Sequence, residues 1–223
     1  MSLLITCHEG VPKFKPAEGI GKKACDMSLI ARIGQDLPLY KFIDTLQTSV
    51  KAARMDAHLL PPQQSHITLV NAILIEEPDN IPPEAEQAEL FNKFHRALSS
   101  EPIRQMLSAP VTMILDTIMV TPVSVRLAAE SPEWRGKRSV IATYLYDQID
   151  SRFNLAEDHA NFWNTIFRFK THFSDNDYDR LQDLLTETAN KEAPFTVEIS
   201  LQNILAVRFP RKFLPWQEAI KLK

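Results

Sequence analysis

Segments with strand-like and helix-like hydrophobic patterns alternate along this chain, and their order constrains the fold more than any other feature. In the first half, Ser28 to Ile33 has the pattern of a strand, and Leu37 to Arg54 places its apolar side chains on one helical face. The run His66 to Val70 is again β-rich, and a helix is expected near 84–98. Strands that alternate with amphipathic helices indicate a sheet covered by helices.

The second half repeats this order of elements. We expect a strand over Val111 to Val120, a shorter strand through Ala129, a helix near 137–153, a strand over Phe167 to Ser174 and a helix near 176–190. At the end of this half, Phe195 to Leu201 and Ile204 to Phe209 flank the short connection Gln202-Asn203, which predicts a hairpin.

The repeated order predicts an α+β fold. It would be bilobed, with two pseudo-repeated lobes, each a β-sheet flanked by helices, around a central cleft. We expect an irregular N-terminal arm over 1–26, a single bilobed domain over 27–209 and a C-terminal tail over 210–223. The lobes would cover roughly 27–110 and 111–209, and exchange of strands between them is allowed.

Composition and charge exclude several classes of protein. The 223 residues include 25 Lys and Arg against 28 Asp and Glu, so the net charge of −3 predicts no grip on long nucleic acid. The 5 glycines cannot form the loops of dinucleotide-binding or P-loop proteins. Cys7 and Cys25 form no C-x-x-C pair, and no apolar run is long enough to span a membrane. We therefore expect a cytoplasmic monomer that uses no cofactor and does not bind membranes.

Two of the 6 histidines lie on expected strands and are followed two residues later by a hydroxyl: His66 by Thr68, and His172 by Ser174. Because side chains alternate along a strand, each histidine and its hydroxyl would share one face. Chance alone gives two such pairs about one time in six. The position of both pairs on the same element of two similarly ordered halves favours a functional interpretation.

Paired histidines of this kind suit the cleavage of a phosphodiester. One imidazole takes a proton from the attacking oxygen, and the other gives a proton to the leaving oxygen. The hydroxyls of Thr68 and Ser174 would hold the non-bridging oxygens, and Arg168 and Lys170, on the face of His172, would contact the substrate phosphate or the leaving group. Alternatively, Arg168 and Lys170 belong to the solvated face of an edge strand.

The motifs His66-Ile67-Thr68-Leu69 and His172-Phe173-Ser174-Asp175 resemble those of the two-histidine (2H) phosphoesterase superfamily, which includes 2′,3′-cyclic phosphodiesterases and RNA-ligase-like proteins. The resemblance implies a metal-independent reaction with His66 and His172 as the acid and base, and Thr68 and Ser174 as phosphate ligands. It implies a small substrate, a nucleotide or RNA end with a 2′,3′-cyclic phosphate. The second motif departs from the pattern at Asp175, where an apolar residue is expected.

Other interpretations of the sequence remain open. Ser174, followed by Asp175 and Asp177, also suits the N-cap of the next helix, which would engage the same hydroxyl. A module that binds a nucleotide or RNA end without turnover is the alternative function, and a metal-dependent phosphohydrolase is a further one. The sequence does not assign the acid and base roles between His66 and His172.

Overall fold

The computed structural model describes residues 2–7, 17–33, 36–75, 77–149, 162–172, 174–212 and 216–222. A mixed six-stranded sheet has the order β1 (Leu4–Cys7), β5 (Val111–Val120), β6 (Ser124–Glu130), β7 (Phe162–Phe169) and β3 (Ala57–Leu59), with β8 (Phe195–Ile199) also paired to β5. An antiparallel four-stranded sheet has the order β10 (Glu218–Lys221), β9 (Ile204–Arg211), β2 (Lys23–Arg32) and β4 (His66–Ile75). The expected α+β class is confirmed.

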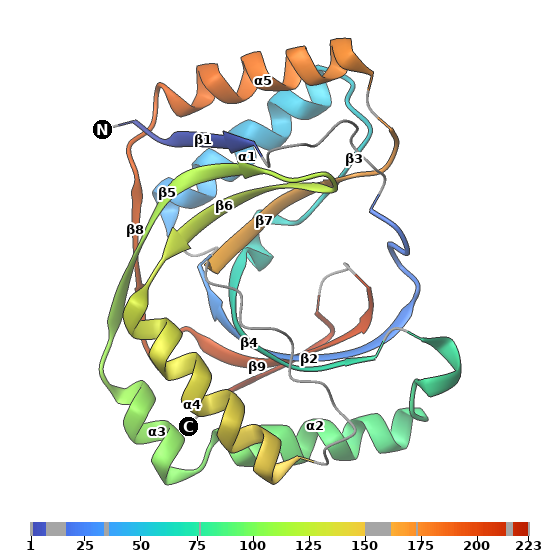
Figure 1. Ribbon diagram of the computed structural model, residues 1–223, viewed down its shortest axis with the longest axis vertical. Helices are drawn as coiled ribbons and strands as arrows, with labels where there is room; N and C mark the ends of the chain where they lie inside the picture. The colour runs from blue at the N-terminus through green and yellow to red at the C-terminus, as the bar shows by residue number, and fades with distance from the viewer. Residues whose placement is uncertain are drawn as a thin grey trace.

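Helices cover the outer face of each sheet (Figure 1). On the six-stranded sheet these are α1 (Leu37–Ala52) and α5 (Asp175–Ala189); on the four-stranded sheet they are α2 (Glu84–Leu98), α3 (Glu101–Ser108) and α4 (Pro132–Gln148). Two short 3₁₀ turns, η1 (Pro62–Gln64) and η2 (Pro78–Asn80), lie in the connections before β4 and α2. The inner faces of the two sheets are thereby left to face one another.

The sequence of α1 shows why these helices form and how they pack. Asp36 caps its N-terminus by accepting a hydrogen bond from the amide of Leu39 at 2.9 Å. The apolar face of α1 is buried, and its members are Leu39, Phe42, Ile43, Leu46 and Val50. An amphipathic helix gains most of its stability by burying such a face, so α1 is fixed against the six-stranded sheet.

Both sheets contain strands from both halves of the sequence. In the four-stranded sheet, β2 and β4 come from the first half, whereas β9 and β10 come from the end of the chain. In the six-stranded sheet, β1 and β3 from the first half join four later strands. The two sheets therefore do not correspond to consecutive segments of the chain.

The expected hairpin near the C-terminus is wrong. β8 pairs with β5, so that Ile199 lies opposite Val111, while β9 pairs with β2, so that Leu205 lies opposite Ile30. The side chain of Asn203 bridges the turn between β8 and β9, accepting from the amide of Ser200 at 2.9 Å and donating to the carbonyl of Glu198 at 2.7 Å. This turn carries the chain from one sheet to the other.

Both expected irregular ends contain strands. The N-terminal arm includes β1, which pairs in parallel with β5, and the first residues of β2; residues 8–16 lie outside the described part of the chain. The C-terminal tail includes the end of β9 and all of β10. The pairing of β1 with β5 joins segments far apart in sequence, so no local pattern indicates it, whereas β10 pairs with the neighbouring strand β9.

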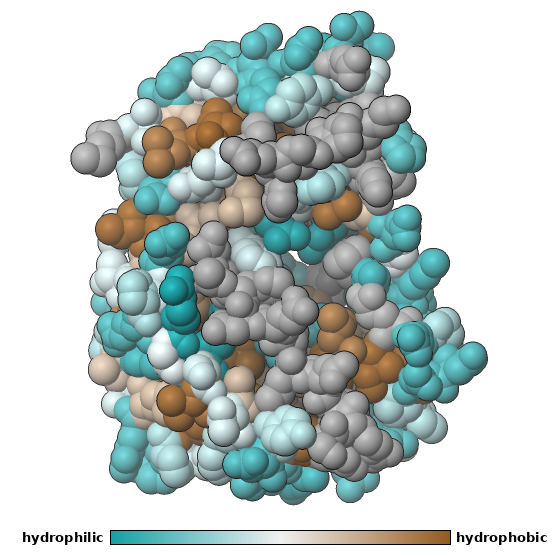
Figure 2. Space-filling model, viewed as in Figure 1, coloured by the Kyte–Doolittle hydropathy of each residue, from teal (hydrophilic) through white to brown (hydrophobic). Residues whose placement is uncertain are grey.

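The surface in this view is polar over α5, and its apolar residues form separate patches (Figure 2). Within the described residues, no helix has the length and apolar character needed to cross a membrane.

Candidate active site

The two sheets meet through β4 and β7, and a hydrogen bond joins them at His66. The side-chain amide of Asn164, on β7, donates to the backbone carbonyl of His66 at 3.0 Å. Asn164 is only 1% exposed, so water does not compete for this bond. The first residue of β4 is thereby held against the six-stranded sheet.

Arg138, on α4, binds the same edge of β4. Its Nε donates to the carbonyl of Leu69 at 2.6 Å, and its Nη2 donates to the carbonyl of Thr68 at 3.2 Å. Its guanidinium carbon lies 3.8 Å from the centroid of the Phe162 ring on β7. Arg138 thus occupies two backbone carbonyls of β4, those of Thr68 and Leu69, which could otherwise pair with another strand or with water.

His66 is held as a neutral imidazole in one tautomer. Its Nδ1 lies 2.8 Å from the backbone carbonyl of Gln64. A carbonyl can only accept, so we infer that Nδ1 carries the hydrogen and Nε2 carries the lone pair. Burial is the main cause that lowers the pKa of His66 to about 4; the bond to Gln64 opposes this, and the nearby cation Arg168 adds to it. At neutral pH, Nε2 can accept a proton.

Aromatic rings cover His66. The ring of Trp216 lies nearly perpendicular to the imidazole, with centroids 5.2 Å apart, and the ring of Phe209 lies 5.8 Å away. A small pocket remains beside the imidazole, lined by Leu60, Pro61, Gln64, Ser65, His66, Thr165 and Trp216. His66, from one sheet, and Thr165, from the other, therefore face the same space.

Two arginines of the six-stranded sheet supply positive charge near His66. Burial and the neighbouring cation Arg126 lower the pKa of Arg168 to about 9, and burial also lowers the pKa of Arg126. Both guanidiniums stay charged at neutral pH. Arg126 lies 4.6 Å over the ring of Trp163 and donates from Nε to Ser124 Oγ at 2.9 Å. Two nearby buried cations favour the binding of an anion.

Hydroxyls from both sheets accompany these charges. On β4, His66 and Thr68 share a face because Ile67 between them is fully buried in the core. On β7, Trp163-Asn164-Thr165 has the same pattern, with Asn164 buried between two half-buried residues. Thr165 thus lies on β7 as Thr68 lies on β4, and Trp163 occupies the place that corresponds to His66.

The expected strand over Phe167 to Ser174 is wrong. β7 begins at Phe162 and ends at Phe169. The Ser174 hydroxyl instead accepts a hydrogen bond from the amide of Asp177 at 3.2 Å, in a capping box at the start of α5. The helix-cap interpretation of Ser174 is therefore the one that the structure shows.

The other residues predicted near Ser174 also lie outside the cleft, with one exception. His172 and Lys170 follow the end of β7 and are exposed, and Lys170 Nζ lies 3.8 Å from Asp56 Oδ1. Arg168 lies within β7 and is near enough to His66 to lower the pKa of its imidazole. His172, Lys170 and Ser174 lie beyond the end of the strand.

Sequence reasoning missed Arg126, Thr165 and Trp216. A local signal existed for Arg126, because a strand that buries Val125 and Leu127 on one face must present the residue between them on the other. The signal for Thr165 was the W-x-T sequence, which lacks the histidine that would draw attention to it. Trp216 lies in the connection between β9 and β10, which pair with each other, in the segment where we expect a C-terminal tail.

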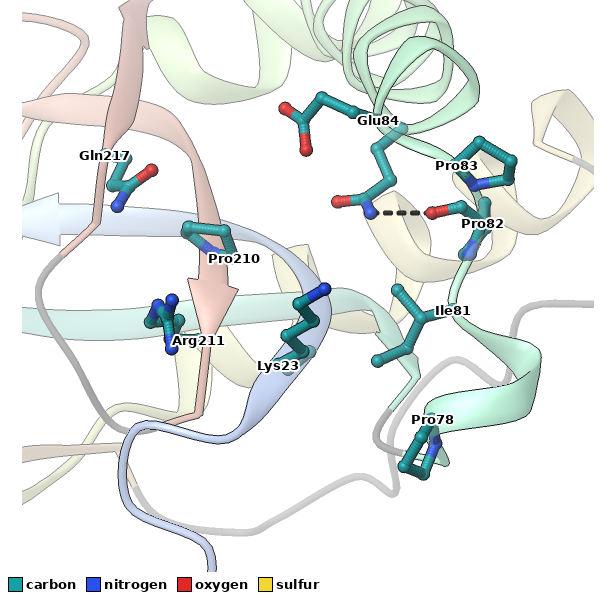
Figure 3. A pocket seen from close by; sticks show the side chains of 11 residues that line it. Lys23, Pro78, Ile81, Pro82, Pro83, Glu84, Pro210, Arg211 and Gln217 are labelled. Atoms are coloured by element: carbon teal, nitrogen blue, oxygen red, sulfur yellow. Dashed lines mark hydrogen bonds between the residues drawn. The ribbon is translucent and has the colours of Figure 1, made fainter.

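A second, larger pocket of about 520 Å³ lies at the end of the four-stranded sheet opposite to His66 (Figure 3). It lies between the start of β2, the end of β9 and the N-terminus of α2, and its charged residues are Lys23, Glu84 and Arg211. Among the described residues that line it, none is a histidine, cysteine, serine or threonine. The smaller pocket, which contains His66 and Thr165, is therefore the candidate site, although its volume is the lesser of the two.

No group of three or more His, Cys, Asp or Glu side chains positioned to hold a metal ion occurs within the described parts of the chain.

Comparison with known proteins shows a shared fold. No protein-family model matches the sequence, and no curated protein matches it significantly. The structure is similar to a conserved protein of unknown function, ATU0111, from Agrobacterium tumefaciens, with a TM-score of 0.59 and 14% identity over 94% of this chain and 90% of that one. It is also similar to TT0787 of Thermus thermophilus, with a TM-score of 0.51 and 14% identity over 88% of this chain and 97% of that one.

A third similar structure is Usb1 of Kluyveromyces marxianus with uridine monophosphate. Its TM-score is 0.47, with 13% identity over 90% of this chain and 98% of that one, a likeness too low to support an argument.

Proposed function

We propose that this protein is a phosphodiesterase that acts on a cyclic phosphodiester, in the first place the 2′,3′-cyclic phosphate of a nucleoside or RNA end. One observation carries the proposal: a neutral imidazole, with its Nε2 lone pair available, shares a pocket with Thr165, the residue that pairs with Arg126, and Arg168 is near enough to lower the pKa of that imidazole. An anionic ester held by Arg126 and Arg168 would lie beside a base able to activate its attacker.

In the proposed reaction, His66 Nε2 takes a proton from a water molecule as the water oxygen attacks phosphorus. The bond from phosphorus to one ribose oxygen breaks, that oxygen takes up a proton from solvent water, and the ring opens to a phosphomonoester. Arg126 and Arg168 stabilise the charge that grows on the non-bridging oxygens, and the hydroxyls of Thr68 and Thr165 donate hydrogen bonds to them. These steps use side chains alone.

The sequence-based roles of His172, Ser174 and Lys170 stay predictions. Their positions beyond β7 give these roles no support, because Ser174 caps α5 and Lys170 lies beside Asp56.

A panel of 2′,3′-cyclic nucleotides, assayed in excess chelator, tests the proposed function. We expect turnover by the wild type and a loss of about 10²- to 10⁴-fold in kcat for His66→Asn, the range typical of a lost general base. His95→Asn, which changes a histidine on α2, is the matched control and should keep full activity. Turnover by His66→Asn at the wild-type rate would contradict the proposal.

A binding module without turnover is the second candidate, and the ring of Trp216 over His66 favours it because this ring restricts access to the imidazole. Calorimetry with the same nucleotides separates the two: tight binding by a wild type that shows no turnover would support the module.

A further inference from the structure

The larger pocket, between the start of β2 and the chain that enters α2, has the size and the lining of a ligand site. Its volume of about 520 Å³ lies within the range of small-molecule sites in proteins, about 300–1,000 Å³. Among the described residues, it shares no lining residue with the pocket of His66. Its apolar wall consists of Ile81 and the prolines Pro78, Pro82, Pro83 and Pro210. Such a wall suits a ligand that carries a ring system.

A buried ion network fixes the other wall of this pocket. Arg208, which is only 4% exposed, binds Glu84 Oε1 on α2 at 2.6 Å and Glu218 Oε2 on β10 at 2.9 Å. Its Nη1 donates to Gln87 Oε1 at 3.3 Å, and Gln87 Nε2 donates to the carbonyl of Pro82 at 2.7 Å (Figure 3). The network joins α2 to β9 and β10, so this wall is in place without a ligand.

The balance of charge in the pocket favours an anion. Arg208 lies between Glu84 and Glu218, so these three side chains together carry one negative charge. Lys23 and Arg211 line the same pocket and outweigh that charge. A ligand with a single negative charge would balance the excess.

The polar groups of Lys23 and Arg211 are also available to a ligand. The ammonium of Lys23 points into the pocket (Figure 3) and forms no hydrogen bond or ion pair with the described residues. Arg211 donates from Nη1 to the carbonyl of Gly21 at 2.9 Å, and its other nitrogens have no partner in the part of the chain that the structure describes. Lys23 lies opposite Arg211 in the pairing of β2 with β9, so both side chains can reach one ligand group.

We propose that this pocket binds a small organic anion of single charge that carries a flat apolar ring, an aryl carboxylate being the simplest case. Lys23 and Arg211 donate hydrogen bonds to the carboxylate, and the ring packs on Ile81 and the prolines. Donors without acceptors on one side and an apolar wall on the other are what such a ligand complements. The site is separate from the pocket of His66 and does not depend on the proposed function.

NMR titration of the wild type with 2-naphthoate tests the site. We expect saturable binding with a Kd of about 1 mM or below, and binding at least about tenfold weaker for the neutral analogue 2-naphthalenemethanol. The backbone amide of Ala24 and the side-chain amide of Gln217 should shift along one curve, while the amide of Thr165, at the pocket of His66, stays unchanged. Tighter binding of the cation 2-naphthylmethylamine would overturn the preference for an anion. Shifts at Thr165 without shifts at Ala24 and Gln217 would overturn the location.

Substitution of the two cations tests their roles. Lys23→Gln and Arg211→Gln should each weaken the binding of 2-naphthoate about fivefold or more, because each removes a charged donor from the pocket. Lys93→Gln is the matched control, since Lys93 is an exposed lysine of α2 that does not line the pocket, and it should stay within about twofold of the wild type. Equal affinities of the wild type and all three variants would overturn the proposal.

Discussion

The side-chain amide of Asn164 donates a hydrogen bond to the backbone carbonyl of His66 across 3.0 Å, and this bond joins the two sheets. Arg138 occupies the carbonyls of Thr68 and Leu69 on the same strand edge. Side chains from β7 and α4 thus donate hydrogen bonds to backbone carbonyls of β4, the strand that carries His66. The position of the imidazole is therefore set by the packing of the two sheets as well as by β4 itself.

Replacement of Asn164 by Leu should destabilise the protein because the carbonyl of His66 would stay buried without a donor. We expect a loss of about 1–3 kcal/mol in the free energy of unfolding, the usual cost of an unsatisfied buried polar group. Urea denaturation followed by circular dichroism measures it. Asn190→Leu, at an exposed position after α5, is the control and should change stability by about 0.5 kcal/mol or less. Equal effects of the two substitutions would show that the bond to His66 contributes nothing.

His66 should make the stability of the fold depend on pH. Its pKa is lowered from 6.5 to about 4 by burial, so the unfolded chain binds more protons than the folded one between these values. Stability should therefore fall as the pH drops from 6.5 to 4, by about 3 kcal/mol at most for this group. In His66→Asn this component is absent, so the stability difference between variant and wild type should shift in favour of the variant across that window. Parallel stability curves for the two proteins would contradict the low pKa.

The local spacing of apolar residues was enough to predict β4, the position of Thr68 beside His66, and helices such as α2. The buried face of a strand or a helix depends on residues that are close in sequence. It failed at β7, where alternation of aromatic and polar residues continued past Phe169 although the backbone had already turned toward the capping box of α5. Arg168 is brought near His66 by the contact of β7 with β4, which joins segments far apart in sequence. Trp216 directly precedes Gln217 and β10, a strand that pairs with its neighbour β9.

Trp216 should limit the access of water to the imidazole of His66. Its ring lies edge-on against the imidazole, so Trp216→Ala would admit water and reduce the desolvation that lowers the pKa of His66. We expect the pKa to rise from about 4 toward its ordinary value of 6.5, as measured by the pH titration of the Cε1–H signal in NMR. The exposed residue Tyr146 gives the control, since Tyr146→Ala should leave this pKa where it is. An unchanged pKa in Trp216→Ala would show that other groups keep the imidazole dry.

Arg168 and Lys170 were predicted together, yet the structure separates their roles. Arg168 lies on the inner face beside Arg126, whereas Lys170 is exposed beside Asp56. Arg168→Ala should therefore weaken the binding of inorganic phosphate about tenfold or more, the effect of losing a charged hydrogen-bond donor worth about 1.5–3 kcal/mol. It should also raise the pKa of His66, because a nearby positive charge that disfavours the imidazolium is removed. Lys170→Ala should do neither, since an exposed ion pair contributes little. Calorimetry with phosphate and NMR titration of His66 measure the two effects, and a loss of binding in Lys170→Ala with none in Arg168→Ala would place the anion beyond the end of β7.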